Sequence, residues 1–251
     1  MNTINDLKKV LKKSTPEGIN GARKSLYQRL CGDKYCYYND IVLFFDFVNY
    51  KTPELLTMNI GIPIDKLGID SRDLGGVETY VEDYFFREIA AVIQLFERDN
   101  VIEDSQKEYV QAKLNIQDCD SRIVKRTCSY LLEDYVYVKC HCKMPLNGLN
   151  AVAGKKALRM ITDLLKELDH WMENFNLNPY EEGRKVYVNQ LKIRDILKEK
   201  KAVCFIRDGS ILPRDSEGKI EENATPFYSP EEMREVLKLS ERETVTGMLI
   251  K

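Results

Sequence analysis

A short segment near residue 210 carries the residues best suited to chemistry. It reads Arg207-Asp208-Gly209-Ser210 and is followed by Arg214. The planar guanidinium group of arginine matches phosphate oxygens, so the pattern predicts a loop that contacts a nucleotide or RNA phosphate, with Arg207 and Arg214 as donors. Asp-Gly also supplies the backbone angles that a tight turn after a strand requires, and this simpler interpretation stays open. The candidate phosphate-binding residues of this segment are Arg207, Asp208, Ser210 and Arg214.

A second basic group lies in the middle of the chain. Lys155, Lys156 and Arg159 follow a glycine-containing loop and fall in the first turns of an expected helix. Helix N-termini attract anions through their free N–H groups and the helix dipole, so an anionic partner would explain basic side chains there. The alternative is a solvated helix face.

Metal and hydrolase chemistry find little support in the sequence. Cys140-His141-Cys142 contains metal-ligating types, but on a strand His141 points away from both cysteines, and structural zinc sites usually use Cys-x2-Cys pairs. The chain contains no Gly-x-Ser-x-Gly, His-Glu-x-x-His, Gly-x-Gly-x-x-Gly or Gly-x-x-x-x-Gly-Lys-Ser/Thr motif. We therefore expect no metal site and no complete active site in these residues.

Short strands and one helix are expected to position the loop near residue 210. Residues 202–206 form an apolar run that ends at Asp-Gly, which predicts a buried strand followed by a turn. Residues 235–239 and 244–250 predict two further strands, and the polar residues 240–243 between them suggest a hairpin. The helical spacing of residues 187–200 places a helix before the first strand, after a break at Asn178-Pro179.

The rest of the chain alternates helical and strand patterns. Long helices are expected near residues 77–98 and 151–175, where apolar residues share one broad face. Strands are expected at 41–50 with a partner at 55–62, and a hairpin at 123–143 places Tyr135, Tyr137, Lys139 and His141 on one side. The order predicts an α+β fold with mostly antiparallel sheets and several packed helices. We divide it into residues 1–100, a helix and strand subdomain, and residues 101–251.

Composition limits the class of protein. The 251 residues are 43% hydrophobic and 31% charged, with a net charge of −2, so any binding to RNA needs a local basic patch. The start of the chain is polar, and no run of about 18 apolar residues exists, so we expect a cytoplasmic protein with no membrane partner. Seven cysteines without a secretion signal are expected to be reduced thiols.

The C-terminal segment resembles the predicted ATPases of the ABC class, a family of bacterial P-loop proteins that includes a kinetoplastid RNA-editing factor. The resemblance extends weakly upstream to the hairpin, the loop at 145–148 and the basic start of the next helix. The residues that carry it are Phe205-Ile206-Arg207-Asp208-Gly209-Ser210-Ile211-Leu212-Pro213-Arg214, Pro226-Phe227, Ser229-Pro230 and Val245-Thr246-Gly247-Met248.

The resemblance implies a part of a larger machine. In the family the strand that corresponds to Met248–Lys251 runs into the glycine-rich phosphate loop, so we expect this chain to be the N-terminal domain, flanking the nucleotide site and lacking the C-terminal P-loop core. The whole protein would bind ATP and Mg²⁺, and ATP would close a homodimer. ABC-type ATPases commonly stack adenine on an aromatic residue ahead of the phosphate loop, which makes Phe227 or Tyr228 a candidate, although burial in a core is the simpler role. The RNA-editing relative implies a contribution to RNA binding.

Three functions follow from these observations. The first is an accessory domain of an ABC-class ATPase that does not hydrolyse ATP by itself. The second is a stand-alone RNA-binding module, in which basic clusters contact phosphates and nearby tyrosines and phenylalanines stack on bases. The third is a structural or dimerisation domain.

Overall fold

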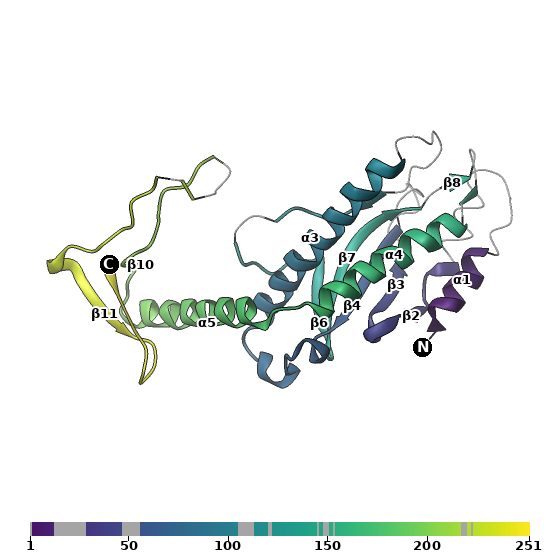
Figure 1. The fold of residues 1–251 in the computed structure, drawn as a ribbon. Coiled ribbons are helices and arrows are strands. Elements are labelled where there is room, and N and C mark those ends of the chain that lie inside the picture. The colour runs from purple at the N-terminus through teal and green to yellow at the C-terminus, as the bar shows by residue number, and fades with distance from the viewer. Residues whose placement is uncertain are drawn as a thin grey trace. The chain divides into compact units, whose positions relative to one another are not determined.

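The computed structural model contains two larger β-sheets, around which its helices pack (Figure 1). The structure describes residues 2–12, 29–46, 56–104, 113–119, 122–144, 146–147, 151–152, 154–216, 220–221 and 223–251. Contacts divide the chain into unit 1, residues 1–119 with 123–177, and unit 2, residues 178–251 with 120–122. The division expected at residue 100 falls inside the long helix α3, Glu78–Asp104, which belongs to unit 1.

Unit 1 contains a sheet with the strand order β1-β2-β3-β4-β7-β5, and β6 pairs with β7. Every pair is antiparallel except β1 with β2, so the prediction of an α+β fold with mostly antiparallel pairing is confirmed. A separate two-stranded sheet joins β8, Leu146–Asn147, to β9, Ala151–Val152. The strands of the larger sheet are β1 Asn2–Thr3, β2 Lys34–Cys36, β3 Val42–Asp46, β4 Leu56–Pro63, β5 Lys113–Asn115, β6 Ser129–Leu132 and β7 Tyr135–Lys143.

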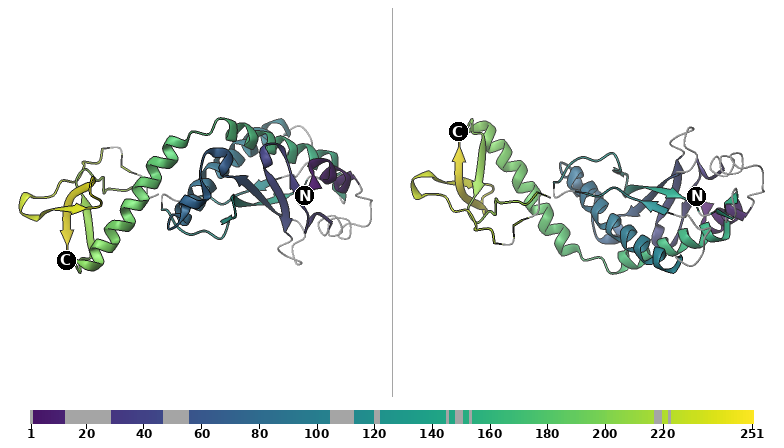
Figure 2. Two further views of the ribbon diagram at one scale, coloured as in Figure 1. Left: turned by 90° about the horizontal axis from the view of Figure 1, so that it is seen from below. Right: turned by 90° about the horizontal axis from the view of Figure 1, so that it is seen from above.

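The helices α1, α3 and α4 of unit 1 lie on one side of this sheet (Figure 2). α1 spans Ile4–Lys12 and α4 spans Gly154–Glu173, and the short 3-10 turns are η1 Tyr38–Asp40, η2 Asp65–Leu67 and η3 Ser71–Leu74. Phe85 of α3 packs its ring against Trp171 at 6.3 Å and Phe175 at 5.9 Å between ring centres. Both expected long helices are confirmed, although α4 begins three residues later than predicted because Ala151 and Val152 pair with β8.

Strand β7 shows how a period-two sequence separates a core face from an outer face. Val136, Val138, Cys140 and Cys142 are buried on the side of the helices, as the alternation predicted. The outer side carries tyrosines, Lys139 and His141.

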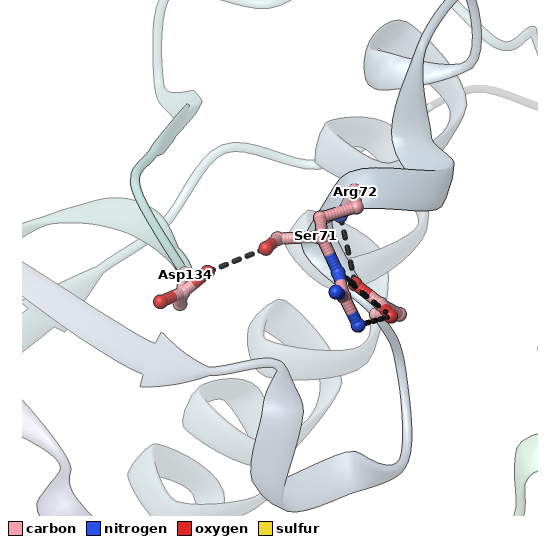
Figure 3. Close-up of polar contacts among 4 residues, drawn as sticks. Ser71, Arg72 and Asp134 are labelled. Carbon is pink, nitrogen blue, oxygen red and sulfur yellow. Dashed lines mark hydrogen bonds and ion pairs between the residues drawn. The ribbon is translucent and has the colours of Figure 1, made fainter.

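The β6–β7 turn is tied to the turn that contains η3 (Figure 3). Ser71 Oγ donates a hydrogen bond of 2.5 Å to Asp134, and the Ile64 amide donates to the Asp134 carbonyl at 2.9 Å. Arg72 donates to the Asp70 carboxylate from its side chain, with Nη2 at 2.6 Å, and from its backbone amide at 2.9 Å. These hydrogen bonds lower the pKa of Asp70 to about 2. The two contacts at Asp134 therefore fix the end of the hairpin that carries the outer tyrosines.

Unit 2 joins one helix to a three-stranded sheet. α5 spans Leu177–Glu199, and β10 Cys204–Arg207, β12 Thr244–Ile250 and β11 Arg234–Lys238 lie side by side in that order, with η4 at Glu231–Met233. The predicted hairpin is confirmed, and its turn is closed by the Leu239 amide, which donates to the Glu243 carbonyl at 2.9 Å. The predicted start of the helix at 187 is wrong. Pro179 lies in the first turn, where a missing N–H costs nothing, so the helix begins at Leu177.

The core of unit 2 lies between α5 and one face of this sheet. Leu237, Leu239 and Val245 are buried there. Ile193 and Ile196 of α5 and Phe205 of β10 pack against them. The side chains of β10 are only half-buried, so the prediction of a fully buried strand there is wrong, because β10 is an edge strand.

Gly247 lets β10 and β12 approach each other closely. It pairs with Arg207 across the sheet, and a Cβ at this position would collide with the Ile206 carbonyl oxygen and the Phe205 ring. We predict that Gly247→Ala destabilises unit 2 by about 1–3 kcal/mol, as overpacking does elsewhere. Denaturant unfolding, with hydrogen exchange of the β10 and β12 peptides, measures this loss.

Gly75→Ala is the matched control for Gly247→Ala. Gly75 has φ −53° and no heavy atom within 4 Å of an added Cβ, so its replacement leaves stability unchanged. Equal stability of the two variants would contradict the close approach of β10 and β12.

Candidate functional site

The tight turn predicted at the end of β10 is present. Gly209 has φ +82°, in the left-handed region that favours glycine, and the Ser210 amide donates to the Arg207 carbonyl at 3.1 Å. The turn is held against Phe227, because the Gly209 amide donates to the Phe227 carbonyl at 2.7 Å and the Phe227 amide donates to the Ser210 carbonyl at 2.8 Å. The backbone of residues 207–210 is therefore fixed on both sides.

Asp208 serves this scaffold. Its carboxylate accepts hydrogen bonds of 2.7 Å from both the amide and the hydroxyl of Ser229, which is buried. Arg234 Nε lies 3.6 Å from the other carboxylate oxygen and also donates to Ser229 Oγ at 3.3 Å. The Ser229 hydrogen bonds hold the pKa of Asp208 below its usual value, and Arg234 adds to this effect. Asp208 thus joins the end of β10 to the segment that leads into β11.

A pocket of about 450 Å³ opens beside Arg207, between α5, β10 and the loop that follows. Its walls are largely apolar, and two arginines, Arg194 and Arg207, line it together with Ser210. Within the part of the chain that the structure describes, neither arginine has a carboxylate partner. The apolar walls are formed by Val186, Ile193, Phe205, Ile206, Leu212 and Val245. An apolar cavity with two unpaired guanidinium groups suits a flat ligand that carries phosphate.

The remaining candidates of unit 2 do not all join this pocket. The Arg214 guanidinium donates to the carbonyls of Ile211 at 2.8 Å and Pro213 at 3.2 Å, so it stabilises its own loop. Phe227 is half-buried, whereas Tyr228 is 68% exposed. Arg207 and Ser210 therefore lie at the pocket, and Arg214, Phe227 and Tyr228 are not among its lining residues.

Lys155, Lys156 and Arg159 belong to unit 1. They lie in the first turns of α4, as the sequence predicted, and their side chains are exposed. Arg159 Nε is 3.5 Å from Asp163 one turn later. The structure therefore divides the two predicted basic groups between two units.

Cys140 and Cys142 face the core of unit 1, while His141 lies on the outer face, 3.4 Å from Thr57 Oγ1. Burial raises the pKa of Cys140 to about 12 and also raises the pKa of Cys142. Across the described ranges, no cluster of three or more His, Cys, Asp or Glu side chains could hold a metal ion.

Sequence reasoning missed Arg194 and Asn189. Arg194 lines the pocket because it lies one turn after Gln190 on the same face of α5, a signal that the helical period does contain. Asn189 Nδ2 donates to Glu243 at 2.9 Å, which lowers the pKa of Glu243 and ties the β11–β12 turn to α5. That contact joins residues 54 positions apart and left no pattern in the sequence.

Residues 178–251 match the family model ABC_ATPase, described as a P-loop domain. The match covers unit 2 almost completely and includes the pocket with Arg207. No curated protein matched the chain. In the described part of the structure, no helix has both the length and the apolar character needed to cross a bilayer.

The scaffold role of Asp208 leads to a pH-dependent prediction. Because the folded-state pKa of Asp208 is lowered, its stabilising effect is present above the ordinary carboxylate range and is lost as pH falls through the folded-state value. We predict that Asp208→Asn lowers the melting temperature of unit 2 at pH 7, and that the difference from the parent protein shrinks below pH of about 3.8. Thermal melts across pH measure this.

Asp195→Asn is the control, because Asp195 is exposed and its carboxylate pairs with Lys198, one turn away, at 3.0 Å. A difference between Asp208→Asn and the parent that stays constant with pH would show that the carboxylate charge has no role in the scaffold.

Proposed function

We propose that residues 178–251 form the strand-rich part of an ABC-class P-loop ATPase and lie beside the nucleotide site of the whole protein. The match of these residues to the P-loop domain of the ABC_ATPase family carries the proposal. In this role the chain is an accessory domain: it supplies surface next to the nucleotide, and a P-loop core outside these 251 residues supplies the phosphate loop.

The outer face of the three-stranded sheet of unit 2 supports a further layer. The side of the sheet turned away from α5 carries Val236, Met248 and Ile250 beside Arg234, Lys238 and Thr246. Val236 is 63% exposed and Ile250 is 37% exposed. Exposed apolar residues bordered by polar ones are typical of protein contacts, and we assign this face to the P-loop core.

The residues of the pocket fit a nucleotide in part. Arg194 and Arg207 suit phosphate oxygens, and the apolar walls suit a base. The lysine and hydroxyl that a P-loop offers to phosphate and Mg²⁺ are not among the 251 residues, which contain no Gly-x-x-x-x-Gly-Lys-Ser/Thr. We therefore assign binding and positioning to this chain and no catalytic step.

The first test concerns hydrolysis and the coding sequence. We predict that the 251 residues show no ATP turnover above background, measured as phosphate release with ATP and Mg²⁺. We also expect the reading frame after Lys251 to encode a glycine-rich loop with Lys-Ser or Lys-Thr within about 20 residues. A reading frame that continues without such a loop would contradict the proposal. So would turnover by the 251 residues that Arg207→Ala abolishes.

The second test concerns the pocket. In the protein that includes its P-loop core, we predict that Arg207→Gln raises the KM for ATP about tenfold or more, because a charge-assisted hydrogen bond to phosphate is lost. Lys198→Gln is the control, since Lys198 lies on the exposed side of α5 and contacts Asp195 at 3.0 Å. Equal KM values for the two variants would show that Arg207 does not contact the nucleotide.

RNA binding is the second candidate function. A specific feature of unit 1 favours it: the outer face of the larger sheet gathers tyrosines and lysines, the two side-chain types that hold single strands through stacking and phosphate contacts.

A further inference from the structure

We propose that single-stranded nucleic acid binds across the outer face of the larger sheet of unit 1, with bases stacked on tyrosines. This inference rests on the second candidate function and assigns it a place that differs from Lys155, Lys156, Arg159 and the loop near residue 210. We call the surface the tyrosine face. It consists of Lys34, Phe44, Tyr130, Tyr135, Tyr137 and Lys139.

Tyr137 is the centre of an aromatic cluster. Its ring stacks with Tyr130 at 5.2 Å and an interplanar angle of 16°, and with Tyr135 at 5.9 Å and 28°. Phe44 approaches from the other side, edge-on at 5.6 Å. Phe44 and Tyr137 belong to β3 and β7, which are separated by β4, so the rings meet across an intervening strand.

Gly61 of β4 makes this meeting of rings across the sheet feasible. It pairs with Tyr137, and a Cβ at Gly61 would lie 2.5 Å from an edge carbon of the Tyr137 ring. The ring therefore lies flat over the glycine, which is how an aromatic side chain forms a platform on a sheet surface rather than standing away from it.

Two lysines lie over the rings. Lys34 Nζ is 5.5 Å from the Phe44 ring centre and 5.7 Å from that of Tyr137, and Lys139 Nζ is 5.2 Å from that of Tyr130. In the described residues, neither ammonium group has a carboxylate partner. Each ammonium group can therefore contact a phosphate while a base stacks on the neighbouring aromatic ring.

The three tyrosine rings differ in solvent exposure, which indicates different roles. Tyr137 is only 4% exposed and supports the cluster, whereas Tyr130 and Tyr135 are half-buried and present ring surface to a ligand. Burial raises the pKa of all three phenols, so they are neutral at ordinary pH and do not repel phosphate.

The described strands of this side carry few carboxylates, while the turns beside them bring Asp40 and Asp65 near Tyr135 and Glu133 near Tyr137. On the described strands, Asp46 is the single carboxylate of the outer side, and Asn59 Nδ2 donates to it at 2.8 Å. Single-stranded nucleic acid combines regularly spaced negative charge with unpaired flat rings, whereas a duplex hides its bases and an acidic peptide lacks the rings.

The test measures binding of the 251-residue protein to labelled oligo-U, oligo-dT and a duplex of equal length by fluorescence anisotropy over a salt series. We expect single strands to bind more tightly than the duplex, with affinity that falls as salt rises. Tyr130→Leu with Tyr135→Leu should weaken single-strand binding roughly tenfold or more, because leucine keeps apolar volume but offers no π-face. Lys34→Gln with Lys139→Gln should lower the slope of log affinity against log salt by about one to two.

Two control variants separate the tyrosine face from the rest of the protein. Tyr38→Leu with Tyr228→Leu removes tyrosines that are 73% and 68% exposed elsewhere and should leave affinity unchanged. Lys155→Gln with Lys156→Gln removes equal charge from α4 and should also leave it unchanged. Circular dichroism checks that each variant is folded. If the tyrosine variant does not fold, the lysine variant provides the test, because Lys34 is exposed and Lys139 is half-buried.

The outcomes are distinct. If the parent protein binds no single strand at low salt, the second candidate function fails and the inference fails with it. If the parent binds but the tyrosine and lysine variants bind equally well, RNA binding stands and the tyrosine face is overturned. If the α4 variant alone loses affinity, the single strand lies on α4 instead.

Discussion

In both units, the helices of the described chain pack against one face of a sheet only. Along β7 and β12 the alternate residues that are buried pack under the helices, and the residues between them face outward. The two outer faces differ in composition: tyrosines and lysines in unit 1, and valine, isoleucine and methionine beside Arg234 and Lys238 in unit 2. We propose a different partner for each face, a single-stranded nucleic acid in unit 1 and another protein layer in unit 2.

The loop near residue 210 shows that conspicuous polar residues can serve structure first. Asp208 holds Ser229, and Arg214 holds the carbonyls of its own loop, so two of the four residues expected at phosphate have scaffold contacts. Arg207 and Ser210 are left at the pocket, where Arg194 joins them from α5. The scaffold contacts fix the backbone from which Arg207 projects, and preorganisation of this kind lowers the entropic cost of binding.

Local sequence patterns predicted much of the fold. The alternation along Tyr135–Lys143 identified the inner and outer sides of β7, and the apolar stripe of residues 77–98 identified the longest helix, because both patterns depend on neighbouring residues only. Long-range pairing was beyond the sequence. Nothing in β4 indicates that β7 lies beside it, or that Gly61 leaves space for the Tyr137 ring. The pocket shares this limit, since Arg194 and Arg207 line one pocket only when α5 packs on β10.

The account depends most on the outer face of unit 1 being a surface that single strands contact. Ultraviolet cross-linking of the 251-residue protein to oligo-U, followed by mass spectrometry of the joined peptides, addresses this directly because short-range cross-links report contact. The account predicts adducts on peptides from β6 and β7, at Tyr130 and Tyr135. Adducts confined to the first turns of α4 or to unit 2, with none on β6 or β7, would contradict it.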